Sequence, residues 1–129
     1  MKLPLVEEGS NEARALWNAE GSLVTSWITF AEVSAAIGAA SRNRRISRRR
    51  ATESVRALHA EWSSVVALEV DEVTSRRAGD LAMRYGLRGM DSIHLASVAS
   101  LAVAQPTLVT WDADMRGAAL AEGLDVASL

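Results

Sequence analysis

The sequence predicts an α/β protein in which a mostly parallel β-sheet is covered by helices on both faces, giving three layers. Short apolar segments rich in β-branched residues alternate along the chain with segments of helical periodicity. This alternation is typical of parallel strands joined by helices. The chain has 129 residues, of which 49% are hydrophobic and 23% charged, enough for one folded domain with its own core. We therefore predict that residues 1–129 form a single domain.

The first half of the chain is predicted to contain a helix, a strand and two further helices. Apolar residues at helical spacing mark the second helix, at Phe30, Val33, Ile37 and Ala40. The predicted bounds are residues 10–20 for the first helix, 23–28 for the strand, a second helix opening at Thr29, and a third running from Ser47 or Arg48 to about Trp62, with Val55, Leu58 and Trp62 as its buried stripe.

The second half continues the alternation of strands and helices. Asp71 is suited to begin a long helix and Gly86 to end it, because aspartate caps helix N-termini and glycine readily adopts the left-handed conformation at their C-termini. The helix after Asp91 is apolar on nearly every side, so it should be buried. The predicted bounds are strand 65–70, helix 72–85, loop 87–90, helix 92–103, strand 107–111, helix 113–122 and strand 124–127.

Composition excludes several classes of protein. The chain has no cysteine, which rules out disulfides, thiol catalysis and thiolate-bound zinc. No apolar run is long enough to span a membrane, and the apolar stretch at the N-terminus is too short for a signal peptide. The glycine loops that hold the phosphates of nucleotide cofactors are also missing, which disfavours a nucleotide-binding enzyme. We expect a soluble cytoplasmic protein without membrane contact.

Charge is distributed unevenly along the chain. The net charge is −2, yet six arginines lie between Arg42 and Arg50. Three interpretations stay open: the arginines guide an RNA backbone by phosphate contacts, they form a solvated loop between helices, or they bind an acidic segment of a partner protein.

Three carboxylates follow or begin predicted elements. Glu32 lies in the first turn of a helix after a strand, Asp91 at the start of a buried helix, and Asp112 directly after a strand. In an open α/β sheet such positions meet at one edge, where ligands bind. Converging carboxylates repel each other unless a divalent cation lies among them, and their oxygens suit Mg²⁺ or Mn²⁺.

Each of these acids also has a purely structural interpretation. Thr29 and Glu32 fit the spacing of a capping box, and Asp91 and Asp112 could simply be N-caps. Spacing alone does not separate these interpretations from a metal site, and one residue can serve both purposes.

Four segments of the chain resemble the PIN-domain family, in particular the VapC-type toxins of type II toxin–antitoxin systems. They occur in the family's order and spacing, and the third segment, in which an aspartate opens a buried helix, is the most specific. The segments are Val6 to Ala13, Ile28 to Val33, Tyr85 to Ala96 and Leu108 to Asp112.

The resemblance implies a PIN-like α/β/α fold and a Mg²⁺- or Mn²⁺-dependent endoribonuclease toxin. It implies an RNA substrate, a cognate antitoxin and a homodimer. Glu32, Asp91 and Asp112 would be the catalytic, metal-binding acids. Asp114 would be an accessory metal-binding acid or else a solvated first-turn carboxylate, and Thr110 would hydrogen-bond at the site or serve the strand.

The start of the chain departs from the family pattern. Family members open with a strand that ends in an aspartate, shortly before the segment matched by Val6 to Ala13, and this sequence has no counterpart. We therefore expect a PIN-like fold without its first strand, arising either from a start assigned too late or from a truncated relic. The alternative function is a catalytically impaired PIN-like module that binds RNA or antitoxin without cleavage.

Overall fold

The computed structural model describes residues 23–127, and the chain divides into two compact units between Ala67 and Leu68. Five α-helices and four short strands occur in the described residues, which confirms the predicted α/β class. The helix predicted over residues 10–20 lies outside the described residues, as does any strand before it. No helix within residues 23–127 is long and apolar enough to cross a membrane.

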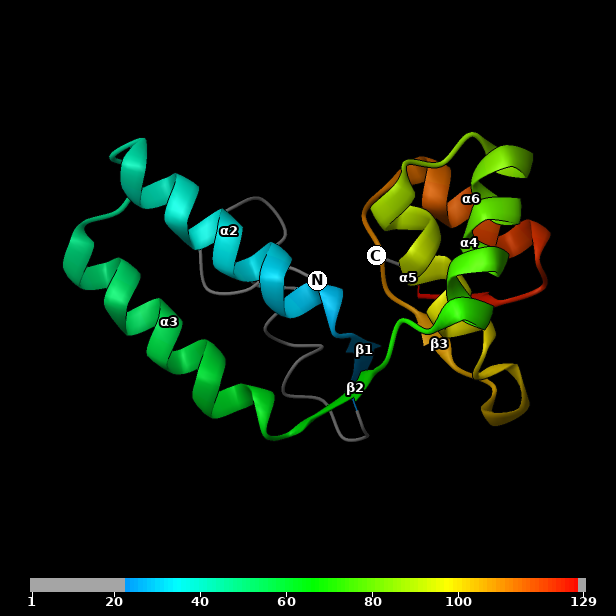
Figure 1. Ribbon diagram of the computed structural model, residues 1–129, viewed down its shortest axis with the longest axis horizontal. Helices are drawn as coiled ribbons and strands as arrows, with labels where there is room; N and C mark the ends of the chain where they lie inside the picture. Colours follow the sequence, from blue (N-terminus) through cyan, green and yellow to red (C-terminus); the bar gives the residue numbers. More distant parts are fainter. Residues whose placement is uncertain (1–22, 128–129) are drawn as a thin grey trace. The chain divides into compact units, whose positions relative to one another are not determined.

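The first unit is built on a pair of helices (Figure 1). Strand β1 (Leu23–Ser26) leads into α2 (Ile28–Arg42), and α3 (Arg48–Trp62) leads into β2 (Val65–Leu68), whose last residue opens the second unit. β1 and β2 hydrogen-bond in a two-stranded sheet. The two helices pack their apolar faces together, and the buried core cluster consists of Val33, Ile37, Leu58 and Trp62.

The apolar stripe predicted for α2 is confirmed, but the stripe predicted for α3 is partly wrong. Val55 is exposed, and Ser54 is buried in its place beside Leu58 and Trp62. These three positions are spaced four residues apart, so they lie on one face of the helix. Ser54 is small, which suits close packing of α3 against α2. Val55 lies one position further round the helix, off the buried face.

The second unit carries three helices and a parallel pair of short strands. Helix α4 (Glu72–Tyr85) packs against α5 (Gly89–Ala99), and β3 (Thr107–Leu108) pairs in parallel with β4 (Asp125–Val126). The remaining elements are the 3₁₀ turn η1 (Ala102–Ala104) and α6 (Ala113–Ala121). Leu95, Ala96 and Ala119 lie at the centre of the core and are fully buried.

Several predicted bounds differ from the observed ones in this unit. Helix α5 begins at Gly89, inside the segment predicted as a loop, and ends at Ala99 rather than near residue 103. The strand predicted over residues 107–111 ends at Leu108, because Thr110 and Asp112 are engaged in the turn that opens α6.

Both predicted ends of α4 are confirmed. The Oδ1 of Asp71 accepts a hydrogen bond from the Thr74 backbone N–H at 2.8 Å. Gly86 has a φ of 64°, a left-handed conformation that costs glycine little because it has no side chain. The hydrogen bond from Thr74 lowers the pKa of Asp71 below its ordinary value of 3.8, since the bond favours the charged form.

This cap should make stability depend on pH in acid. Because the folded pKa of Asp71 is lowered, its contribution is present above pH 3.8 and is lost as the pH falls below that value. We expect Asp71→Ala to lower Tm at neutral pH, and the difference from the parent chain to shrink on acidification. Asp71→Asn is the control, because asparagine caps about as well as aspartate. Thermal melts across this range test the prediction, and a difference that does not change with pH would contradict it.

Candidate active site

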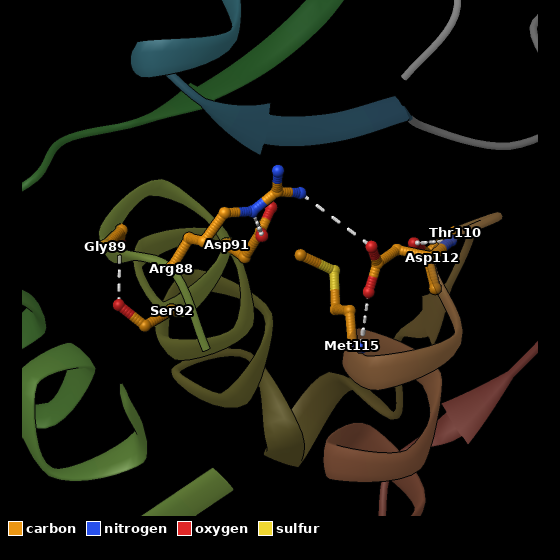
Figure 2. Close-up of polar contacts among 7 residues, drawn as sticks. All are labelled: Arg88, Gly89, Asp91, Ser92, Thr110, Asp112 and Met115. Atoms are coloured by element: carbon orange, nitrogen blue, oxygen red, sulfur yellow. Dashed lines mark hydrogen bonds and ion pairs between the residues drawn. The ribbon is translucent and has the colours of Figure 1, made fainter. Parts of the chain in front are cut away.

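Two of the predicted acids come together in the second unit, around one arginine (Figure 2). Asp91 lies in the first turn of α5, and Asp112 is the N-cap of α6. The Nε of Arg88 donates a hydrogen bond to Asp91 Oδ2 at 2.9 Å, and its Nη2 lies 3.8 Å from Asp112 Oδ2. Both carboxylates therefore face the same positive charge.

The site is open to solvent on the side of the arginine. The side chain of Arg88 is 80% exposed, whereas that of Asp91 is 22% exposed. The hydrogen bond to Asp91, followed by the negative charges of Asp91 and Asp112, raises the pKa of Arg88 above its usual value. The guanidinium therefore stays charged, and a ligand can reach it and the carboxylates from solvent.

Asp112 is held by the turn that opens α6. Its Oδ1 accepts a hydrogen bond from the Met115 backbone N–H at 2.8 Å, and its own backbone N–H donates to Thr110 Oγ1 at 3.1 Å. The N-cap interpretation of Asp112 is confirmed, and so is a hydrogen-bonding role for Thr110. Because Oδ1 caps the helix, Oδ2 is the oxygen that faces Arg88.

Arg116 supports this turn with two hydrogen bonds to backbone carbonyls. Its Nη2 donates to the Thr110 carbonyl at 3.2 Å, and its Nη1 donates to the carbonyl of Ala127, next to β4, at 3.1 Å. The guanidinium thus links the turn that carries Asp112 to the end of the chain's last strand. The role of Arg116 is not predictable from the sequence, since nothing in the local pattern marks its two partners.

Asp91 is not the N-cap of its helix, and that interpretation is wrong. The N-cap is Arg88, whose side chain makes no capping bond, and the Ser92 hydroxyl donates to the Gly89 carbonyl at 2.7 Å. Because α5 begins at Gly89, the Asp91 carboxylate points sideways to Arg88 rather than back to the helix end. A carboxylate in the first turn is also favoured by the helix dipole.

The capping box predicted for Thr29 and Glu32 is also wrong. Helix α2 begins at Ile28, and its N-cap Trp27 makes no side-chain capping bond. Thr29 is buried inside the first turn, and its hydroxyl shares a 2.7 Å hydrogen bond with that of Thr25. Glu32 is half-buried just beyond this turn, in the first unit. A common site for Glu32 with Asp91 and Asp112 stays a prediction.

Asp114 lies in the first turn of α6, two residues after Asp112, and is exposed. Its role as an accessory acid likewise stays a prediction. Within residues 23–127, no group of three or more acidic, histidine or cysteine side chains lies close enough together to hold a metal ion. Of the predicted site acids, the described structure brings together Asp91 and Asp112 through their contacts with Arg88.

The donor set of this pair fits a hard divalent cation. Each carboxylate turns one oxygen toward a shared positive charge, and Mg²⁺ is commonly held by one or two carboxylates while retaining several waters. The sequence motifs do not mark Arg88 as a site residue, although it lies three residues before Asp91, the spacing at which helical side chains meet.

Comparison with known proteins identifies the family of the chain. The family model described as PIN domain matches residues 5–120, and the chain belongs to this family, as its motifs predicted. Two similar curated proteins are Ribonuclease VapC45 of Mycobacterium tuberculosis strain CDC 1551 / Oshkosh and Ribonuclease VapC49 of strain ATCC 25618 / H37Rv. Each is 36% identical over 129 residues, covering 98% of this chain and 88% of the relative.

Proposed function

We propose that this protein is a metal-dependent endoribonuclease that hydrolyses RNA phosphodiester bonds and serves as the toxin of a toxin–antitoxin pair. The proposal rests on one observation in a chain of the PIN family. The carboxylates of Asp91 and Asp112 lie at the starts of two helices and both face the guanidinium of Arg88. The relatives named ribonucleases support the same reaction.

Asp91 and Asp112 would hold a divalent cation, Mg²⁺ or Mn²⁺, with Glu32 as the third acid and Asp114 as an accessory. When bound, such an ion supplies a water nucleophile at neutral pH and neutralises charge that develops on the phosphoryl group. The hydrogen bonds to Asp112 from Met115 and within the turn keep one of its oxygens directed at the site before any ligand arrives. Such preorganisation lowers the cost of binding.

Arg88 is the residue best placed to contact the substrate. Its guanidinium is mostly exposed and lies at the edge of the acidic pair. A guanidinium presents paired N–H donors that match the oxygens of a phosphate. We propose that it turns from the carboxylates to the RNA phosphate, so that it neutralises the acids in one state and holds the substrate in the other.

One observation favours the alternative function, a PIN-like module that binds RNA or antitoxin without cleavage. The contacts of Arg88 with Asp91 and Asp112 already balance part of the acidic charge, which reduces the need for a metal ion. The two functions differ in a cleavage assay on a mixed RNA pool. The endoribonuclease cleaves with Mg²⁺ or Mn²⁺ and not with EDTA, whereas a folded chain that never cleaves but still binds RNA or antitoxin is the module.

The partners that we propose follow from membership of the toxin class. They are an RNA substrate, a cognate antitoxin and a second copy of this chain, in the cytoplasm. We further propose that the two units form a single PIN-like domain.

Light scattering after size-exclusion chromatography, with and without co-expressed antitoxin, measures the size of the assembly. A purely monomeric chain at high concentration would contradict the homodimer.

Removing the charge of Arg88 should strengthen metal binding. Arg88→Met keeps the length of the side chain but leaves Asp91 and Asp112 without their shared cation. We expect the affinity for Mn²⁺ to rise about tenfold, the scale of one charge a few ångströms away in a partly exposed site. Titration followed by electron paramagnetic resonance measures free Mn²⁺ without any RNA.

Arg84→Met is the matched control for this experiment. Arg84 pairs with Glu122 at 3.4 Å, so its loss removes the same charge from a different ion pair of the same unit. We expect its Mn²⁺ affinity to stay near that of the parent chain. An unchanged or weaker affinity in Arg88→Met would contradict the competition between Arg88 and the metal ion.

A further inference from the structure

The connection between α2 and α3 forms a hollow of about 610 Å³ that the proposed cleavage site does not use. The connection lies at the end of the helix pair away from β1 and β2 (Figure 1). We call the hollow the arginine hollow, because four of its seven lining residues are arginines and the others are two serines and one isoleucine. The arginines are Arg42, Arg44, Arg45 and Arg48.

The backbone of this connection is ordered by its own hydrogen bonds. The N–H groups of Arg45 and Ile46 both donate to the Ala40 carbonyl, at 2.9 and 3.3 Å, and that of Arg44 donates to the Ser41 carbonyl at 3.1 Å. Ile46 packs against the apolar core of the first unit. The exposed arginines therefore project from a fixed scaffold, and a ligand need not order the backbone.

Two features of this segment work against its stability. Helix α3 has arginines at its first three positions, Arg48 to Arg50, and no acid in its first turn, although the positive end of the helix dipole favours acids there. Arg44 has a φ of 56°, a left-handed conformation that is costly for a residue with a side chain. Positions that break local rules in this way are expected at functional sites.

The lining favours a nucleic acid over an acidic protein. Protein interfaces usually have an apolar centre with aliphatic or aromatic anchors. The apolar residue of this hollow, Ile46, is already packed into the core, and the other six lining residues are polar. Interfaces with nucleic acids are polar and strongly positive, and arginine matches phosphate oxygens well. The phosphates of a nucleic acid therefore match the lining of the arginine hollow better than an acidic protein does.

The distance along α2 relates this hollow to Glu32, the acid of the first unit that we propose as the third acid of the site. Glu32 and Arg42 lie ten residues apart on one helix, roughly 15 Å at about 1.5 Å per residue. A stacked nucleic-acid strand rises roughly 3.4 Å per phosphate along its axis, so about four or five phosphates cover that length. A single RNA strand can therefore contact both Glu32 and the hollow.

We propose that the arginine hollow binds phosphates of the RNA backbone, a few nucleotides along the strand from Glu32. It adds affinity without reading sequence, because phosphate contacts carry no base information. This inference rests on the proposed ribonuclease function for its substrate class, but the binding it describes does not require cleavage.

The test measures binding of a fluorescein-labelled, mixed-sequence single-stranded RNA by anisotropy in EDTA, across a series of salt concentrations. Arg48→Glu places an acid at the start of α3 and reverses one charge of the hollow. We expect affinity to fall about tenfold and the salt slope to fall by about 0.7, the value for one phosphate contact on a single strand. Its Tm should be unchanged or higher, since the new acid suits the helix dipole.

Two further variants sharpen this result. Arg50→Glu is the matched control, because it makes the same charge change in the same helical turn at a residue that does not line the hollow. Its effect on RNA affinity should be clearly smaller. Arg44→Gly relieves the left-handed backbone, so it should keep or raise Tm while weakening RNA binding.

The outcomes separate this inference from the proposed function. Equal losses in Arg48→Glu and Arg50→Glu, or no loss in either, would overturn the arginine hollow as the binding site. Displacement of the RNA by polyglutamate at equal charge concentration would overturn the nucleic-acid assignment in favour of an acidic peptide. A chain that binds RNA through the hollow but does not cleave it with Mg²⁺ or Mn²⁺ would uphold the inference while the ribonuclease proposal fails.

Discussion

Asp91→Asn is expected to abolish metal-dependent RNA cleavage while leaving the fold intact. Asparagine has the same shape, but it lacks the negative charge that Asp91 turns toward Arg88 and the proposed metal ion. Even residues that only support a metal ligand change affinity or activity by about 10- to 100-fold, so loss of a ligand itself should lower kcat/KM by about a hundredfold or more. Cleavage of a mixed RNA pool and a parallel Mn²⁺ titration measure the effect.

Asp112→Asn provides a second test at the other carboxylate. Asparagine is as good an N-cap as aspartate, so the hydrogen bond from Met115 and the start of α6 should be preserved. Cleavage should nevertheless fall to the level of Asp91→Asn, because the charge facing Arg88 is lost.

The matched control for both variants is Asp71→Asn. It neutralises the N-cap of α4, which has no part in the proposed site, so cleavage and Mn²⁺ affinity should stay at the level of the parent chain. Cleavage that survives in both Asp91→Asn and Asp112→Asn would mean that the acidic pair is not the active site. Equal loss in Asp71→Asn would point to a general effect of charge on folding.

Leu95→Ala is expected to destabilise the second unit by about 2–5 kcal/mol, the range for removing a buried leucine side chain and leaving a cavity. Leu95 is fully buried and lies one turn after Asp91 in α5, within the cluster that packs α4, α5 and α6 together. Urea unfolding followed by circular dichroism gives the change in the free energy of unfolding.

Leu120→Ala is the control for the loss of a leucine as such. Leu120 is 58% exposed on α6, so its truncation should change the free energy of unfolding by no more than about 0.5 kcal/mol. A similar cost in both variants would contradict the core described here. The Mn²⁺ affinity of the folded Leu95→Ala protein should also stay close to that of the parent chain, because no carboxylate is removed.

The sequence alone determined the features whose causes are local. The apolar stripe of α2 follows from the spacing of Val33, Ile37 and Ala40. Both ends of α4 follow from the capping chemistry of Asp71 and Gly86, and Asp112 was correctly predicted as a possible cap. The contacts of the caps lie within one helical turn, and the stripe is a regular spacing along one helix, so nearby residues carry the information in each case.

The tertiary structure decided the features that depend on where a helix begins and how far it is rotated. The spacing of Thr29 and Glu32 fits a capping box, but α2 begins earlier, at Ile28, and Thr29 is buried inside its first turn. Val55 is apolar like Leu58 and Trp62, yet the rotation of α3 leaves it exposed and buries Ser54. Neither outcome is visible in the local pattern, because it is set by what packs against the helix.

The same reasoning explains the site. The motifs identified Asp91 and Asp112, which lie twenty-one residues apart, as members of one acidic group. That they share Arg88, and that Arg116 supports the turn of Asp112, became visible only when α5 and α6 were packed together. Sequence patterns report the chemistry and the local conformation of each residue, whereas the meeting of side chains from separate helices is set by the packing of the core beneath them.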